Sequence, residues 1–328
     1  MNSRNDNNKT MDLCAFGEIL IDFTEGGQDE NGHSHFIRYP GGAPGNVCVG
    51  AARLGKKTAF IGKAGDDMHG QFLKDVLNRE NVNTDSLVLD PDTFTTLAFV
   101  SVSEQGERTF AFARKPGADT QMRFEEVDPA LLENTRIFHV GSLSLTHEPA
   151  RETTFRSIEQ AKEHGAIISY DPNYRASLWP SKQKAVEAMR SLIQYADIMK
   201  ISDEETGLLT DHEDPAEAAA ALIDQGVQAA AVTLGAAGVL VANHEGSAVV
   251  PGFKSEVADT NGAGDSFWAA FLTRIAESGR TPGELSLEEL REFARFANGA
   301  AALTVRKHGA IPAMPTRREL EIFLEENQ

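Results

Sequence analysis

Short apolar runs alternate with helix-like segments through the middle of the chain. In chain order they occupy residues 137–140, 150–164, 166–170, 182–195, 198–201, 215–225 and 229–233, beginning and ending with a strand. Alternating strands and helices are typical of a mostly parallel sheet with helices on both faces. Ligands bind such sheets beyond the carboxyl ends of the strands. The sequence therefore predicts an α/β fold with its binding site along one edge of the sheet.

Polar and glycine residues follow these strands at the points where the strands end. They are Asn173, Arg175, Glu205, Thr233 and Gly235. Because the carboxyl ends of parallel strands meet at the same edge of a sheet, we expect these residues to lie along one rim.

The stretch from Asp259 to Asp265 reads Asp-Thr-Asn-Gly-Ala-Gly-Asp and precedes an expected helix, in which Phe267, Phe271 and Ile275 recur every four residues. Backbone N–H groups at a helix N-terminus lack intrahelical partners and, with the helix dipole, can hold an anion. A carboxylate in that first turn suits a site that both holds a phosphoryl group and accepts a proton. An acid there is also common simply because it complements the dipole.

Two segments in the first half of the chain also predict a binding site. Residues 13–23 form an apolar run, and thus an expected buried strand, that carries Glu18 and Asp22. An unpartnered buried carboxylate is costly, so we expect one of them, and favour Asp22, to lie where the strand meets a cleft. The segment from Gly41 to Asn46 leads into an expected helix over 47–54. Asn46 is placed either to cap that helix or to hydrogen-bond a ligand hydroxyl.

Residues 95–102 and 108–113 alternate around a polar turn and predict a β-hairpin, and residues 25–40 predict a second, short one. Such insertions into an α/β chain are either a lid that excludes water or an edge decoration. Together they predict a small sheet over one end of the main domain. Its apolar side would allow a homodimer through the lid, by pairing across a two-fold axis. That side consists of Leu97, Phe99, Phe110 and Phe112.

Composition excludes several classes of function. The formal net charge of −18 over 328 residues argues against nucleic acid or an anionic membrane as a partner, because both bind a basic face. Two cysteines are too few for a disulfide framework, and the nine histidines show no His-Glu-x-x-His spacing that would indicate a transition-metal site. Residues 1–10 lack a signal-peptide pattern, and no apolar stretch is long enough to span a membrane. We expect a cytoplasmic protein.

These residues resemble the ribokinase-like, or PfkB, family of carbohydrate kinases, from Leu13 to the end of the chain. Gly41-Gly42-x-x-x-Asn46 looks like the first family signature, and Asp259–Asp265 looks like the second, with Asn261 where Thr is more usual. Within the family, the segments at 41–46, 171–175 and 200–205 look most like bacterial and plant fructokinases. The resemblance implies a three-layer αβα sandwich with a mostly parallel central sheet and a small β-sheet lid. The expected kinase domain covers residues 12–328, after a disordered N-terminus at 1–11, with lid segments at about 24–40 and 93–116.

The resemblance implies ATP-dependent phosphorylation of a hydroxyl of fructose, giving fructose 6-phosphate. Asp265 would be the base, and the backbone N–H groups of Gly262, Ala263 and Gly264 would form the anion hole. An Asp with an ordinary pKa is already ionised at pH 7 and can accept the proton late in the transfer. The sugar-binding residues would be Asp22, Gly41, Gly42, Asn46 and Arg114. The nucleotide-binding residues would be Asn173, Arg175, Lys200, Ser202, Glu205, Thr233, Gly235, Gly238 and Asn298.

Two metal ions are implied in the same way. Glu205 matches the acid of the family's Asn-x-x-Glu motif, which organises Mg²⁺ and phosphates through water, although Ser202 stands in the Asn position. Many relatives also bind K⁺ through the residue that matches Asp259 and through backbone carbonyls near Gly309.

Two other functions remain open from the sequence. One is a kinase for 2-keto-3-deoxygluconate, whose carboxylate would favour a basic lid residue such as Arg38, Arg108 or Arg114. The other is a regulator that binds a sugar and has lost phosphoryl transfer. The intact Gly-Ala-Gly segment and Asp265 argue against the regulator.

Overall fold

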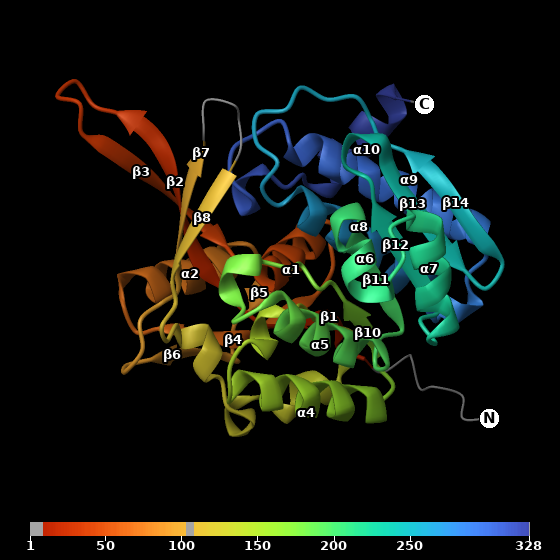
Figure 1. Ribbon diagram of the computed structural model, residues 1–328, viewed down its shortest axis with the longest axis horizontal. Helices are drawn as coiled ribbons and strands as arrows, with labels where there is room; N and C mark the ends of the chain where they lie inside the picture. The colour runs from red at the N-terminus through yellow and green to blue at the C-terminus, as the bar shows by residue number, and fades with distance from the viewer. Residues whose placement is uncertain (1–8, 103–107, 328) are drawn as a thin grey trace.

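The computed structural model describes residues 9–102 and 108–327. Its main body is built on a sheet whose strand order is β14-β13-β12-β11-β10-β9-β1-β4-β5, with β6 paired to β4 (Figure 1). The strands are β1 (Met11–Phe16), β4 (Thr58–Gly65), β5 (Val82–Asn83), β6 (Leu87–Asp90), β9 (Thr135–Val140), β10 (Ile167–Tyr170), β11 (Ile198–Ser202), β12 (Ala229–Thr233), β13 (Gly238–Asn243) and β14 (Gly246–Pro251). Along this order, the neighbouring strands from β12 through β11, β10, β9, β1 and β4 to β5 pair in parallel. Strands β13 and β14 are added antiparallel. The predicted mostly parallel sheet is confirmed.

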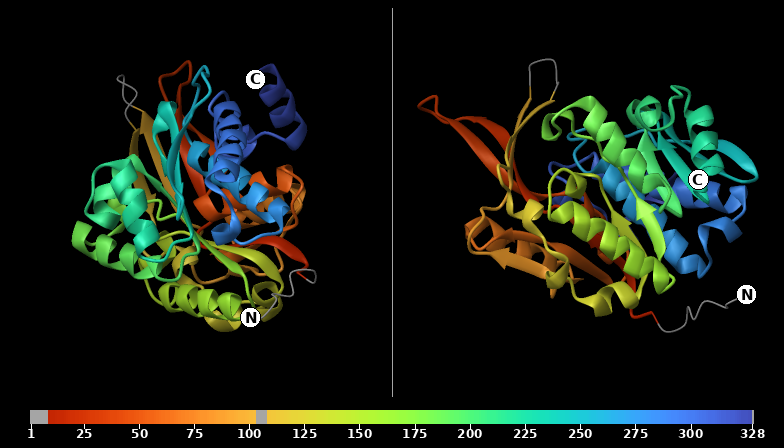
Figure 2. Two further views of the ribbon diagram at one scale, coloured as in Figure 1. Left: turned by 90° about the vertical axis from the view of Figure 1, so that its right-hand side faces the viewer. Right: turned by 60° about the horizontal axis from the view of Figure 1, so that its bottom comes forward.

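Helices cover both faces of this sheet (Figure 2). One hydrophobic core joins the sheet to α1, α2, α8, α9 and α10, and a second joins it to α3–α7. In β1, Leu13 and Ala15 belong to the first core, and Cys14 and Phe16 to the second, as strand alternation requires. The helices are α1 (Ala43–Arg53), α2 (Met68–Arg79), α3 (Pro129–Glu133), α4 (Ala150–Glu163), α5 (Lys182–Ile193), α6 (Thr206–Thr210), α7 (Pro215–Asp224), α8 (Ala263–Ser278), α9 (Leu287–Thr304) and α10 (Arg317–Glu326). The predicted three-layer sandwich is confirmed.

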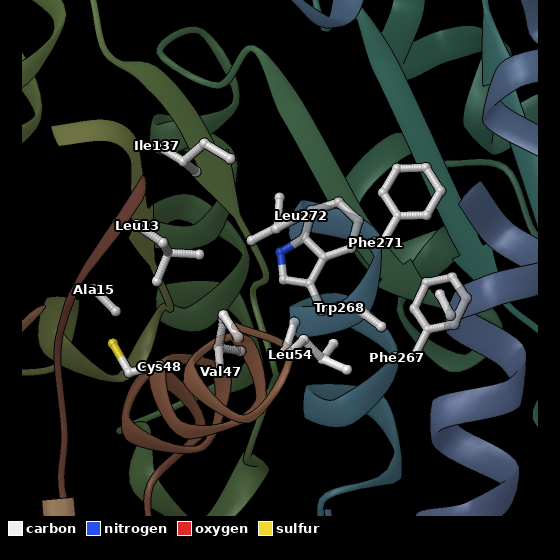
Figure 3. Close-up of a cluster of buried hydrophobic side chains, with 14 of the residues drawn as sticks. Leu13, Ala15, Val47, Cys48, Leu54, Ile137, Phe267, Trp268, Phe271 and Leu272 are labelled. Carbon is white, nitrogen blue, oxygen red and sulfur yellow. The ribbon is translucent and has the colours of Figure 1, made fainter. Parts of the chain in front are cut away.

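Helices α1 and α8 pack against the same face of the sheet. Figure 3 shows Val47 and Cys48 of α1 and Trp268 and Leu272 of α8 gathered against Leu13 of β1, and all five are buried. Full burial of a large apolar side chain contributes roughly 1.5–3 kcal/mol. This packing fixes the positions of the two helix N-termini, which carry the two glycine segments singled out in the sequence.

A smaller sheet projects from the body, at the upper left of Figure 1. Its strands are β2 (Leu20–Gln28), β3 (Ser34–Gly41), β7 (Leu97–Val102) and β8 (Arg108–Ala113), in the order β3-β2-β7-β8. Both predicted hairpins are therefore present and share one sheet, although the polar turn at 103–107 lies outside the described residues.

The prediction of one strand over residues 13–23 is wrong. The run divides into β1 of the main sheet and β2 of the small sheet, with Gly17 between them. Gly17 has φ +152°, and a Cβ there would lie 2.7 Å from the ring of Pro44. A side chain would not fit where the backbone leaves the main sheet, and the apolar pattern is the same on both sides of the break. Asp22 thus lies on the small sheet.

The disordered N-terminus was predicted to extend to residue 11, which is too far along the chain. Residues 1–8 lie outside the described part of the chain, but Met11 already belongs to β1, and the N–H groups of Thr10 and Met11 donate to Asn134 O. None of the helices in the described residues combines the length and apolarity that crossing a membrane would need.

Candidate active site

The two glycine segments meet in space. Helix α1 begins at Ala43 after Gly42, and α8 begins at Ala263 after Gly262. Asn46 lies in the first turn of α1, and its Nδ2 donates a hydrogen bond of 2.7 Å to Asp265 Oδ2 in the first turn of α8. Asn46 is therefore not a helix cap. The predicted cap is wrong, and the predicted hydrogen bond from Asn46 to a ligand hydroxyl stays a prediction.

Asp265 lies at the centre of this arrangement. Burial raises the pKa of its carboxyl above the ordinary value, and the hydrogen bond from Asn46 opposes the rise. The prediction of an ordinary pKa for Asp265 is wrong, because the sequence does not reveal how deeply the first turn of α8 is buried. A raised pKa makes the carboxylate a better proton acceptor.

The glycines before and in α8 lie close to neighbouring groups, and Gly262 also has a left-handed backbone. Gly262 has φ +74°, and a Cβ there would lie 2.8 Å from Ala310 Cα. A Cβ on Gly264 would lie 3.3 Å from Lys200 Nζ, so the ammonium group faces the first turn of α8 directly. The N–H of Ala263 is directed to Thr260 O at 3.3 Å. A helix N-terminus with a facing ammonium group is suited to bind a phosphate.

Lys200 is held by a buried ion pair. Its Nζ lies 2.6 Å from Oδ2 of Asp171, and both side chains are buried. Asp171 follows β10 directly and Lys200 lies on β11, so the pair joins neighbouring strand ends. Asp171 was not predicted as a site residue, although it follows a strand as Asn173 does, because its pairing with Lys200 spans 29 residues.

A cleft of about 480 Å³ opens beside Lys200 and Gly264. It brings together most of the predicted nucleotide-binding residues, namely Asn173, Arg175, Lys200, Ser202, Glu205 and Thr233. Its other lining residues were not predicted, and they are Tyr174, Lys182, Glu204 and Leu208. The predicted rim at the carboxyl ends of the strands is thus largely one cleft.

Glu205 anchors the floor of this cleft. Its Oε1 accepts from the N–H of Tyr174 at 2.7 Å, and its Oε2 accepts from the N–H and the Oγ of Ser202 at 2.8 and 3.1 Å. A carboxylate offers about four lone-pair positions, so one remains for a water molecule. The residues therefore fit a Mg²⁺ ion held through water, with Ser202 supporting Glu205 in place of Asn.

Asp259 is engaged by two backbone groups. Its Oδ1 accepts from the N–H of Asn261 at 2.7 Å, and its Oδ2 accepts from the N–H of Gly309 at 3.0 Å. The carboxylate is buried beside the loop before α8 and supplies the oxygen ligands that a hard cation prefers, so Asp259 fits the predicted K⁺ site. Gly309 meets Asp259 through its N–H and not through its carbonyl, so the carbonyl ligands of such an ion would come from its neighbours.

The sugar-binding predictions converge on β2 and the glycine segment. Burial raises the pKa of Asp22 to about 6, against the opposing effects of a hydrogen bond from Asn261 and the charge of Arg175. The carboxylate packs on Gly41 so closely that a Cβ there would collide with it. Gly42 has φ +104° and would place a Cβ 2.5 Å from Glu18 O.

Asn46 also contributes an unpaired acceptor. Its Oδ1 is buried and has no hydrogen-bond partner within the described residues. Buried polar atoms are rarely left unpaired in a folded protein, so this atom is available to accept a hydrogen bond from a ligand.

Arg114 is engaged by groups of the protein itself, and its predicted contact with the sugar stays a prediction. Its guanidinium is buried and donates to Asp119 Oδ2 at 2.6 and 2.8 Å, and also to Thr146 Oγ1 and Leu143 O. In this arrangement Arg114 braces the base of the small sheet.

Three predicted nucleotide-binding residues lie apart from the cleft beside Lys200. Nδ2 of Asn298 donates to Val250 O and Pro251 O, at 3.1 and 3.0 Å. Gly235 and Gly238 flank the turn between β12 and β13 with φ +56° and +106°. A second hollow, of about 650 Å³, is lined by residues 254–258 and Arg306. Sequence reasoning missed this hollow because residues 252–258 show neither helical nor strand periodicity.

Comparisons with known proteins agree with this geometry. A model of the pfkB family of carbohydrate kinases matches residues 10–317. A protein named Probable fructokinase-2, from Arabidopsis thaliana, is 41% identical over 328 residues, which cover 99% of each chain. The crystal structure of a fructokinase from Xylella fastidiosa with bound ATP has a TM-score of 0.89 and 35% identity, and the match covers 97% of this chain and 99% of that one.

A fructokinase double mutant from Vibrio cholerae O395, solved with fructose, ADP and a potassium ion, has a TM-score of 0.84 and 31% identity. The match covers 96% of this chain and 99% of that one. The fold is therefore ribokinase-like, as the sequence predicted. The protein belongs to the PfkB family of carbohydrate kinases.

Proposed function

We propose that this protein is a fructokinase, which transfers the γ-phosphoryl group of ATP to fructose and yields fructose 6-phosphate and ADP. The observation that carries the proposal is the bond of 2.7 Å between Asn46 Nδ2 and Asp265 Oδ2, because it joins a hydroxyl-binding segment to a carboxylate at a helix N-terminus. The names and bound ligands of the relatives described above support the same substrates here.

The acceptor sugar would lie between β2 and the first turn of α1. The carboxylate of Asp22 and the unpaired Oδ1 of Asn46 are acceptors for its hydroxyl groups. Gly41 and Gly42 would let the backbone approach the sugar closely. In this position one hydroxyl faces Asp265, which already contacts the same Asn46.

Phosphoryl transfer then follows from this placement. Asp265 takes the proton of the attacking hydroxyl, the oxygen bonds to the γ-phosphorus, and the bond from that phosphorus to the β,γ-bridging oxygen breaks to release ADP. The N–H groups of Gly262 and Gly264, with that of Ala263 once it leaves Thr260 O, and the Lys200 ammonium would stabilise the charge on the transferring group. Holding charges in place before the reaction avoids the cost of reorganising them during it.

The nucleotide would occupy the cleft beside Lys200. Arg175 and Lys200 face its phosphates, and the rest of the predicted set lines its path, namely Asn173, Ser202, Glu205, Thr233, Gly235, Gly238 and Asn298. Mg²⁺, held through water at Glu205, would neutralise charge on the phosphates. K⁺ at Asp259 would support the loop before α8, and the Vibrio cholerae fructokinase solved with a potassium ion supports the presence of such an ion.

The small sheet would act as a lid over the sugar, and a second copy of the chain would pair with its exposed face. Phe36 and Phe99 of this sheet are 43% and 36% exposed, which is unusual for large apolar side chains that lie together. Phe99 and Phe36 contact each other edge to face, with ring centroids 5.8 Å apart. The apolar side predicted from sequence is wrong, because Phe112 lies opposite Ala98 in the pair of β7 and β8 and so shares a face with Ala98, not with Leu97 and Phe99. The Phe110 side chain lies outside the described residues.

Two of the arginines that could bind the carboxylate of 2-keto-3-deoxygluconate contact other groups of the protein. Arg38 lies over the ring of Phe72, 3.9 Å from its centroid, and Arg114 pairs with Asp119. The side chain of Arg108 lies outside the described residues. Fructose, which needs no cation in the sugar site, is therefore the better-supported acceptor.

A coupled assay of ADP release over a panel of sugars tests the proposal. Fructose should give the highest kcat/KM, and release should depend on both the sugar and Mg²⁺. Binding of fructose by calorimetry without any fructose-dependent ADP would contradict kinase activity. A higher kcat/KM with 2-keto-3-deoxygluconate would contradict fructose as the substrate but not phosphoryl transfer.

A further inference from the structure

Asn261 is held at its backbone, and its side chain reaches out of its own loop. Its N–H donates to Asp259 Oδ1, and the following Gly262 adopts a left-handed conformation. The side chain then extends to β2 of the small sheet, where Nδ2 lies 3.3 Å from Asp22 Oδ2. The turn itself uses only the backbone of Asn261, so this contact with a residue 239 positions away is a separate feature of the side chain.

This contact mirrors the bond between Asn46 and Asp265. In one bridge, an amide from the sugar-binding segment donates to the carboxylate at the start of α8. In the other, an amide from the loop before α8 donates to the carboxylate on the sugar side. Each half of the site therefore supplies one asparagine and one aspartate, and each aspartate is held by the asparagine of the other half.

Asp22 depends on Asn261 for its orientation. Within the described residues, the hydrogen bond from Asn261 is the one bond that the side-chain oxygens of Asp22 accept. Gly41 confines the carboxylate from the side of β3. The negative charges of Asp259 and Asp265 disfavour the ionised form of Asp22, and the charge of Arg175 favours it. A neutral donor at this point stabilises the ionised carboxylate and fixes one of its oxygens.

We propose that Asn261 is a positioning residue for the acceptor sugar, because its side-chain amide holds Asp22 Oδ2 and so directs the other carboxylate oxygen toward the sugar hydroxyls. The inference rests on the proposed sugar-binding role of Asp22. It gives the residue that departs from the family's usual Thr a role in sugar binding, separate from the anion hole that its neighbours form.

A double-mutant cycle tests this inference. Asn261→Ala removes the donor but keeps the backbone turn, and Asp22→Ala removes the acceptor. A hydrogen bond to a charged group contributes to binding free energy on a scale that corresponds to about tenfold or more in Kd. Asn261→Ala should therefore raise the Kd for fructose by that factor, as measured by calorimetry without nucleotide. The KM for fructose should rise similarly, while the KM for ATP changes less than about twofold. In the Asp22→Ala background, Asn261→Ala should have almost no further effect, because contacting residues are not additive.

The control is Asn83→Ala, since Asn83 also donates to a nearby carboxylate, Asp85 Oδ2 at 2.8 Å, but on the surface. It should leave the Kd and both KM values unchanged. Equal effects of Asn261→Ala with and without Asp22, or no effect at all, would overturn the inference. If the wild-type protein does not bind fructose, the proposed substrate fails instead. The same cycle measured with the sugar that gives the highest kcat/KM in the panel then decides the inference, which non-additivity supports and additivity overturns.

Discussion

At the scale of single residues, Glu18 is a buried carboxyl group at the point where the chain passes from the main sheet to the small sheet. Its Oε1 accepts from the N–H of Ala43, and its Oε2 has no hydrogen-bond partner in the described part of the chain. Burial raises its pKa to about 7. Below about pH 7, the folded protein therefore holds the Glu18 carboxyl mainly in its neutral form.

This preference predicts a loss of stability as the pH rises. The unfolded chain releases the Glu18 proton near its ordinary pKa of about 4.5 and the folded protein only near 7, so the free energy of unfolding falls between those values and stays lower above them. The shift corresponds to a loss on the order of 3 kcal/mol.

Glu18→Gln keeps the acceptor for Ala43 without a titrating proton. Denaturant unfolding at pH 5 and pH 8 should therefore show a smaller loss for this variant than for the wild type. Glu163→Gln, at an exposed position at the end of α4, should behave like the wild type. The same loss in Glu18→Gln as in the wild type would contradict the assignment.

The roles of single residues were only partly predictable from the sequence. Asp265, Asn46 and Lys200 could be singled out because each stands in a local motif at the start of a helix or the end of a strand. Their partners could not, since the bond from Asn46 spans 219 residues and the bond from Asn261 spans 239. The brace formed by Arg114 and Asp119 was missed for another reason. Sequence position near a lid does not reveal whether a guanidinium faces the sugar or the protein interior.

At the scale of elements, the N-terminus of α8 depends on a backbone conformation that only glycine adopts readily. Gly262 has φ +74° and lies against Ala310. Gly262→Ala adds both the left-handed penalty of roughly 1–2 kcal/mol and a collision with Ala310. The loop would shift away from the phosphate, and loss of a single anion-hole donor typically lowers kcat about 100-fold or more.

Steady-state kinetics of Gly262→Ala should therefore show a fall in kcat of about 100-fold, with the KM for fructose little changed. Gly55→Ala is the matched control. Gly55 has φ +87°, but no atom lies within 4 Å of the position that a Cβ would occupy there. This variant therefore incurs the backbone penalty alone. It should lose stability but keep kcat. A wild-type kcat in Gly262→Ala would show that this loop does not hold the transferring group.

Elements were predictable wherever their pattern is local. The helix after Asp265 and the hairpin formed by β7 and β8 show clear periodicity, and both are present. The run over residues 13–23 was read as one strand because β1 and the start of β2 are both buried and apolar. Which sheet a strand joins depends on its partners, and those lie at 58–61 and 135–140 for β1 but at 34–41 and 97–100 for β2.

At the scale of the whole molecule, the projecting small sheet predicts self-association. Phe36→Glu would place a charge on its exposed apolar face and should convert a dimer to a monomer in sedimentation velocity experiments. Val249→Glu, a change at a 56% exposed apolar position on β14, is the control and should remain dimeric. A wild-type protein that is monomeric at micromolar concentration would contradict pairing through this face.

The central claim is that Asp265 takes the proton from a fructose hydroxyl during transfer from ATP. ³¹P NMR of a reaction with fructose, ATP and Mg²⁺ follows product formation directly, and Asp265→Asn removes the base while keeping the shape of the side chain. The account predicts fructose 6-phosphate from the wild type, and a rate at least about 100-fold lower from Asp265→Asn with fructose binding retained. Formation of fructose 6-phosphate at the wild-type rate by Asp265→Asn would contradict it.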